Sequence, residues 1–188
     1  MYIHRKEKLI FLAHPRTGSH AVQKALLDIG FDKTNPGSHH KTLYADGVVN
    51  GRNRPEWYVF TTVRNHWDTA ISWMAKEYQL WGTEQPSWSL KDFKKIIGNH
   101  PWVRDGQFWW VHEDVDVIMH YESLEDDLNE ILWEFSLPSV KLSMVNVSPK
   151  REGRHYSEFY TETTKDYIWT KFGNEISKFG YEFEERKL

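Results

Sequence analysis

Two segments of this chain share one layout, and together they limit the folds that it can adopt. Residues 9–20 and 59–72 each begin as a short apolar run, break into a polar turn and continue as a helical pattern. Such a turn can hold an anion, because loop amides and the positive end of the helix dipole point toward it. The polar residues concerned are Arg16, Gly18 and Ser19 in the first segment and Arg64 and Ser72 in the second. Two such turns predict a ligand with two separated anionic groups.

The rest of the chain alternates strand and helix patterns, which predicts an α/β fold with a mostly parallel central sheet flanked by helices. A length of 188 residues suits a single domain spanning residues 1–188. The expected strands are 9–13, 57–63 and 115–120, with 140–147 extended and 32–53 rich in loops. The expected helices are 18–29, 68–79, 90–97 with Ser89 as its cap, 122–135, and 161–172 with 174–179 as one helix or a kinked pair.

Composition excludes several classes of protein. Without Cys, the chain has no disulfide framework, no thiol nucleophile and no thiolate metal site. A formal net charge of -3 argues against general nucleic-acid binding, which needs a basic field. The sequence has no secretory signal and no apolar run long enough to span a bilayer. We therefore expect a cytoplasmic protein without nucleic-acid or membrane partners.

The first turn does not fit the common nucleotide-binding motifs. With Gly18 as the second glycine of the Walker motif, the other fixed positions fall on Ala13, Ser19 and His20, and none of them matches. The dinucleotide fingerprint fails as well, because the turn has one glycine. What remains is a Pro-Arg-Thr-Gly-Ser turn suited to one phosphate. The alternative interpretation is an ordinary strand-to-helix turn with a solvated Arg16.

The second turn places Arg64 at the end of an apolar run, and Ser72 follows two helical turns later. In α/β proteins, ligands bind at the carboxyl ends of the parallel strands. This position predicts a second anion-binding turn. The alternative interpretation is that Arg64 pairs with an acid such as Asp68 and that Ser72 faces solvent.

In this order the two motifs resemble those of the sulfotransferases that use 3′-phosphoadenosine 5′-phosphosulfate (PAPS). Residues 15–19 (PRTGS) resemble the family's 5′-phosphosulfate loop, and residues 63–72 (VRNHWDTAIS) resemble its 3′-phosphate motif. The resemblance continues through 117–124 (VIMHYESL), 146–150 (NVSPK) and 179–183 (FGYEF). It covers nearly the whole chain and is closest to the short bacterial, carbohydrate and protein-tyrosine branches. Ordered motifs in a strand–turn–helix context are what such a match requires.

The resemblance implies a P-loop-like sulfotransferase architecture and an enzyme that moves the sulfuryl group of PAPS to a hydroxyl or amine. The nucleotide product would be 3′-phosphoadenosine 5′-phosphate (PAP), and no metal is implied. The acceptor would be a small molecule, a carbohydrate or a tyrosine-containing chain. Catalysis would depend on positioning and charge stabilisation, as in phosphoryl transfer, and on a general base.

The resemblance also implies roles for individual residues. Arg16 would hold the 5′-phosphate and the leaving oxygen, and His40 would be the general base, with His39 as the close alternative. The cofactor-binding residues it implies are Arg16, Thr17, Gly18, Ser19, His20, Arg64, Ser72, Lys150 and Arg154. Three positions depart from the family pattern, namely His20 for Thr, His66 for Pro and Thr69 for Arg.

Three other functions stay open at this point. The first is a small nucleotide or sugar kinase of related fold, although the Walker lysine is missing. The second is a nucleotide-binding module without catalytic activity. The third is a carbohydrate-binding domain built on the 10 Trp of the chain, since flat rings stack on sugars.

Overall fold

A computed structural model of the chain describes residues 1–34, 43–44, 47–80, 87–98, 106–107, 114–143, 151 and 153–186, and of residues 78–80 it describes the backbone alone. Within these residues the chain is an α/β protein with a five-stranded mixed sheet and flanking helices. It divides into two compact units, each built from two stretches of sequence. The first unit is Met1–Val63 with Trp109–Asn146, and the second unit is Arg64–Phe108 with Val147–Leu188. The prediction of one domain over residues 1–188 stays a prediction.

The first unit contains the sheet, whose strand order is β3-β1-β2-β4-β5. The strands are β1 (Tyr2–His4), β2 (Leu9–Leu12), β3 (Asp32–Lys33), β4 (Tyr58–Val63) and β5 (Val117–His120). The middle strand β2 (LIFL) is a continuous apolar run, and β4 (YVFTTV) is buried from Val59 to Val63, because both faces of these strands are covered. The described residues of this unit form the helices α1 (Ser19–Asp28) and α5 (Leu124–Glu134) and the 3-10 turns η1 (Arg54–Glu56) and η2 (Tyr121–Ser123).

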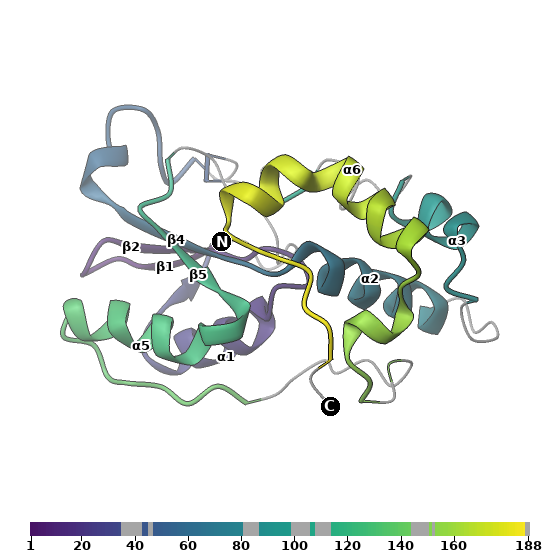
Figure 1. Ribbon diagram of the computed structural model, residues 1–188. Coiled ribbons are helices and arrows are strands. Elements are labelled where there is room, and N and C mark those ends of the chain that lie inside the picture. Colours follow the sequence, from purple (N-terminus) through teal and green to yellow (C-terminus); the bar gives the residue numbers. More distant parts are fainter. Residues whose placement is uncertain are drawn as a thin grey trace. The chain divides into compact units, whose positions relative to one another are not determined.

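Helices α1 and α5 lie side by side against one face of this sheet (Figure 1). Val22 and Leu26 of α1 and Leu128 and Leu132 of α5 are fully buried there, at the helical spacing of an inward face. The opposite face is covered by Leu43, Val49 and Trp57 from the connecting segments. The turn between β2 and α1 lies at the edge of the sheet where β2 and β4 end.

The sheet is mixed, whereas the sequence predicted a mostly parallel one. Strand β4 pairs in parallel with β2 and β5, but β1 is antiparallel to both β2 and β3. Only residues 5–8 join β1 to β2, and so short a connection allows an antiparallel pair but not a crossover. Strand β3 lies inside the stretch predicted to be loop, because its two residues depend on pairing with β1 rather than on a local apolar pattern.

The second unit is helical in the part that the structure describes. It contains α2 (His66–Leu80), α3 (Leu90–Ile96), the 3-10 turn η4 (Tyr156–Phe159) and α6 (Glu162–Lys178). These elements share one core, in which Ile71, Met74, Phe93, Ile168 and Ile176 are fully or almost fully buried. In Figure 1, α2, α3 and α6 are the helices drawn in blue, teal and yellow-green.

Most predicted elements are confirmed, with shifts of one or two residues at their ends. Ser89 caps α3 as expected, since its side chain accepts a hydrogen bond from the amide of Asp92. The last helical segment is one helix, not a kinked pair, and Thr161 caps it. In the described residues we find no helix that combines the length and the apolar character needed to cross a bilayer.

Candidate functional site

The first predicted anion-binding turn lies in the first unit, between the end of β2 at Leu12 and the start of α1 at Ser19. Arg16 is half-buried and has a φ of 65°, and Gly18 has a φ of 77°. A left-handed backbone is unusual for arginine, and such strained residues concentrate at functional sites. The turn is thus held in a specific shape that exposes part of the Arg16 side chain.

The hydroxyls in this turn bond to the turn's own backbone. Thr17 Oγ1 donates to the carbonyl oxygen of His14 at 2.9 Å and also forms a short hydrogen bond with Thr62 Oγ1. Ser19 Oγ donates to the same carbonyl at 2.6 Å. Both side chains are buried, at 0% and 1% exposure. The hydroxyls of Thr17 and Ser19, two of the residues that the resemblance assigns to the cofactor, therefore brace the turn in this structure.

Gly18 has a packing role that the sequence did not indicate. A Cβ added at this position would lie 2.7 Å from Cδ2 of Leu124 and 2.9 Å from Cδ2 of Tyr121. The residues that resemble the family's Tyr-Glu-x-Leu segment thus press directly on the turn. Glycine is required here both for this close approach and for the positive φ.

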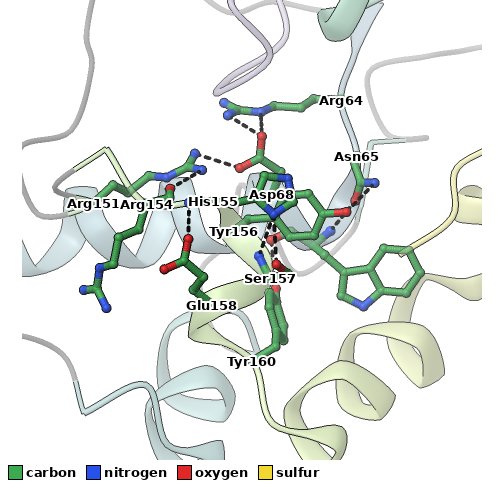
Figure 2. A network of polar contacts seen from close by, with 11 residues as sticks. Arg64, Asn65, Asp68, Arg151, Arg154, His155, Tyr156, Ser157, Glu158 and Tyr160 are labelled. Carbon is green, nitrogen blue, oxygen red and sulfur yellow. Dashed lines mark hydrogen bonds and ion pairs between the residues drawn. The ribbon is translucent and has the colours of Figure 1, made fainter. Parts of the chain in front are cut away.

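The second unit contains a cluster of charges around Asp68, which Figure 2 shows. Arg64 donates to Oδ2 of Asp68 from Nε at 2.8 Å and from Nη2 at 2.6 Å. Arg151 donates from Nη1 to the other carboxylate oxygen, Oδ1, at 2.7 Å. We call Arg64, Asp68 and Arg151 the arginine cluster. The alternative interpretation that Arg64 pairs with Asp68 is confirmed, but the pair is part of a larger, net positive group.

The arginine cluster is largely shielded from water. The side chains of Arg64, Asp68 and Arg151 are 9%, 12% and 19% exposed. Opposite charges in such a place attract more strongly than at the surface, and the pairing fixes the guanidinium groups in position. The three side chains together carry two positive charges and one negative charge.

Ser72 and Arg154 differ in their relation to this cluster. Ser72 is 4% exposed, so the interpretation that it faces solvent is wrong. It lies four residues after Asp68 on α2, and residues at this spacing share one helix face. Arg154 points away from Asp68 in Figure 2, and its guanidinium lies 4.3 Å from the ring centroid of Phe159. Its carbonyl oxygen accepts a hydrogen bond from Arg151 at 3.3 Å.

Tyrosine side chains next to the cluster are held in the neutral form. Tyr160 donates a hydrogen bond to the carbonyl oxygen of Trp67 at 2.8 Å, and burial raises its pKa well above the usual value. Burial likewise raises the pKa of Tyr156 to about 12. The hydroxyl of Tyr156 receives hydrogen bonds from Asn65 at 3.4 Å and from the amide of Glu184 at 2.7 Å. These neutral rings line the arginine cluster without adding negative charge.

The structure does not describe several of the residues that the sequence predicted for the site. His39, His40 and Lys150 lie outside the described residues, as do Trp81, Trp102, Trp109 and Trp110. His20 is half-buried in the first turn of α1. Arg151 lies between the predicted residues Lys150 and Arg154 in the sequence, and the sequence did not single it out. Its neighbours Lys150 and Arg154 carry the same charge, and no local signal separates the three.

Within the described ranges, no group of three or more His, Asp and Glu side chains is arranged to hold a metal ion. A scan against protein-family models and a search of curated proteins both find no match to this chain.

Proposed function

We propose that this protein is a sulfotransferase that moves the sulfuryl group of PAPS to a hydroxyl or amine acceptor. The observation that carries the proposal is the arginine cluster, in which one carboxylate orients two largely buried guanidinium groups. A guanidinium presents a planar fork of donors that matches a phosphate group, and its charge persists at every physiological pH. The residues present thus fit the 3′-phosphate that the sequence resemblance assigns to Arg64 and Ser72.

The turn at residues 13–18 supports the second half of the proposal. Helix α1 begins without a side-chain cap and without an acidic residue in its first turn. Its first amides and the Arg16 guanidinium are therefore suited to an anion, here the 5′-phosphosulfate. Since the hydroxyls of Thr17 and Ser19 bond to His14, we assign the binding of this group to backbone amides and Arg16.

When bound, PAPS supplies the sulfuryl group. In the transfer, the bond between sulfur and the bridging phosphate oxygen would break with its electron pair left on PAP, and a bond would form between sulfur and the acceptor oxygen. Arg16 would offset the charge that develops on the leaving oxygen. The proton of an acceptor hydroxyl would pass to His40, or to His39 in the alternative assignment. These roles are the same for every hydroxyl acceptor, so a carbohydrate, a tyrosine side chain and a small alcohol all fit the proposal.

The test is a calorimetric titration of the protein with PAP, with adenosine 5′-phosphate and with ATP plus magnesium. We expect PAP to bind at least about tenfold more tightly than adenosine 5′-phosphate, because one charge-assisted contact to the 3′-phosphate is worth that much. Equal affinities for PAP and adenosine 5′-phosphate would overturn the proposal. A preference for magnesium-ATP would favour the kinase alternative.

Turnover separates an enzyme from a binding module. With PAPS and an acceptor screen, the unsubstituted protein should release PAP, and Arg16→Ala should abolish the release. His40→Ala should slow the chemical step and leave the affinity for PAP nearly unchanged. Binding of PAP without turnover on any acceptor would support the module without catalytic activity.

A further inference from the structure

The backbone of Arg64 is held at two points by one side chain. The Arg64 amide donates to Oε1 of Gln107 at 3.0 Å, and Nε2 of Gln107 donates to the carbonyl oxygen of Arg64 at 2.7 Å. Gln107 is 2% exposed and Arg64 is 7% exposed. Both hydrogen bonds are therefore shielded from water, and losing either one would leave a buried backbone group without its partner.

Gln107 is in turn held by Glu175 of α6. The amide of Gln107 donates to Oε2 of Glu175 at 2.6 Å, and Nε2 of His66 lies 2.8 Å from the same oxygen. Nε2 of Gln107 also lies 3.2 Å from Nε2 of His66. Glu175 thus connects the segment that holds Arg64 with the first residue of α2. His66 and Glu175 are 4% and 7% exposed.

The backbone next to Gln107 is adapted to this carboxylate. Gly106 has a φ of 73°, and a Cβ at this position would overlap Oε1 of Glu175. Only glycine lets the backbone come so close to the carboxylate. His66 and Glu175, which are 109 positions apart in the sequence, both contact Gln107, His66 at its side chain and Glu175 at its backbone amide.

We infer that Gln107 and Glu175 are positioning residues for Arg64, and that they set the direction in which its guanidinium is presented. Asp68 holds the end of the Arg64 side chain, and Gln107 holds its backbone, so the arginine is fixed at both ends. The inference rests on the proposed function only in taking the 3′-phosphate as the group that Arg64 receives. It also gives His66 a role at a position where the resembled family has proline, because the imidazole ring contacts Glu175.

The first experiment measures the order of Arg64 without any ligand, by nitrogen-resolved NMR of the arginine Nε–H groups. In the unsubstituted protein, the Arg64 Nε–H is buried against Asp68 and should exchange slowly with water. Gln107→Met keeps the side-chain volume and removes both hydrogen bonds to Arg64, and Glu175→Ala removes the carboxylate. Each should speed this exchange by about tenfold or more.

The controls for this experiment are built into the chain. Arg54 Nε donates to the carbonyl oxygen of Asp114 at 2.9 Å in the first unit, and its exchange should not change. Glu162→Ala removes an exposed glutamate from the same helix as Glu175 and should have no effect. Glu175→Gln keeps an acceptor for the Gln107 amide and should restore most of the protection.

Unchanged Arg64 exchange in folded Gln107→Met and Glu175→Ala would overturn the inference. If either variant does not fold, Gln107→Glu decides, because it keeps the acceptor for the Arg64 amide and loses the donor. Loss of protection there supports the inference, and unchanged protection overturns it.

A titration then connects positioning with binding. Gln107→Met should weaken the binding of PAP by about tenfold and that of adenosine 5′-phosphate by less than about twofold. If the unsubstituted protein itself does not distinguish these nucleotides, the proposed function fails, while the exchange rates still decide the role of Gln107 and Glu175. Equal losses for both nucleotides in Gln107→Met would contradict a role directed at the 3′-phosphate.

Discussion

The two regions that we propose to bind anions, the turn at residues 13–18 and the arginine cluster, are stabilised by different kinds of interaction. The turn at residues 13–18 is defined by its backbone conformation, because Arg16 and Gly18 adopt positive φ. The hydroxyls of Thr17 and Ser19 stabilise this conformation by donating to the carbonyl oxygen of His14. The arginine cluster is defined by charged side chains, because Asp68 accepts hydrogen bonds from both guanidinium groups. The first region depends on shape and the second on charge, so substitutions should affect them in different ways.

The largest effect should come from Arg64→Ala. The substitution removes the positive charge in excess over Asp68, so the cluster becomes neutral and PAP should bind about thirtyfold more weakly or worse. The loss for adenosine 5′-phosphate should be much smaller. The measurement is calorimetric titration of both nucleotides, and equal losses would show that Arg64 does not contact the 3′-phosphate.

Arg186→Ala is the matched control for Arg64→Ala. It removes an arginine from another ion pair of the second unit, in which Nη1 lies 2.8 Å from Oε1 of Glu158 and the side chain is 61% exposed. Exposed ion pairs contribute little, so the affinity for PAP should stay within about twofold. A loss as large as that of Arg64→Ala would mean that any arginine of this unit has the same effect.

The shape-dependent region should respond most to Gly18→Ala. The new Cβ meets Leu124 and Tyr121 in a backbone conformation that suits glycine, so the free energy of unfolding should fall by about 2–4 kcal/mol. Gly47→Ala is the control in the same unit, because its φ is 67° and its Cβ would meet no described atom within 4 Å. It should cost about 1 kcal/mol. Equal losses in urea unfolding would show that packing against Tyr121 and Leu124 is unimportant.

A smaller effect is expected for Thr17→Val, which removes a hydroxyl and keeps the shape. The free energy of unfolding should fall by about 1 kcal/mol, because Thr17 donates to His14 and bonds to Thr62 in the core. The affinity for PAP should change by less than about threefold if backbone amides hold the 5′-phosphate. Thr34→Val, at a more exposed hydroxyl bonded to Met1, should change stability by less than about 0.5 kcal/mol. A large loss of affinity for PAP in Thr17→Val would show that the Thr17 hydroxyl contacts the 5′-phosphate.

The last effect, which is absent at neutral pH, is a dependence of stability on alkaline pH. The folded state raises the pKa of Tyr156 from 10.0 to about 12, so between these values the unfolded chain has lost the phenolic proton and the folded protein still holds it. Stability is therefore fully present below pH 10 and falls as the pH rises toward 12. Urea unfolding at several pH values should show a shallower fall in Tyr156→Phe than in the unsubstituted protein. An unchanged slope would remove Tyr156 as a cause.

Much of the secondary structure could be predicted from local patterns. The structure confirms strands β2 and β4 and the inward leucines of α5, all of which depend on residues close together in the sequence. Strand β3 could not be predicted in this way, since its two residues are a strand only through pairing with β1. Part of the second region was also foreseeable, because Arg64 and Asp68 are four residues apart at the start of a helix.

The sequence by itself determined the order of the parallel strands β2, β4 and β5 and of the helices between and after them, and it placed Arg16 and Arg64 just beyond the ends of two of these strands. Only the tertiary structure decided which further side chains join them. Arg151 reaches Asp68 across 83 positions, and Glu175 reaches Gln107 across 68. It also decided that Thr17 and Ser19 turn toward His14. Local periodicity reflects contacts within one helix or strand, whereas the partner of a buried charge or hydroxyl depends on packing between distant segments, which no local pattern encodes.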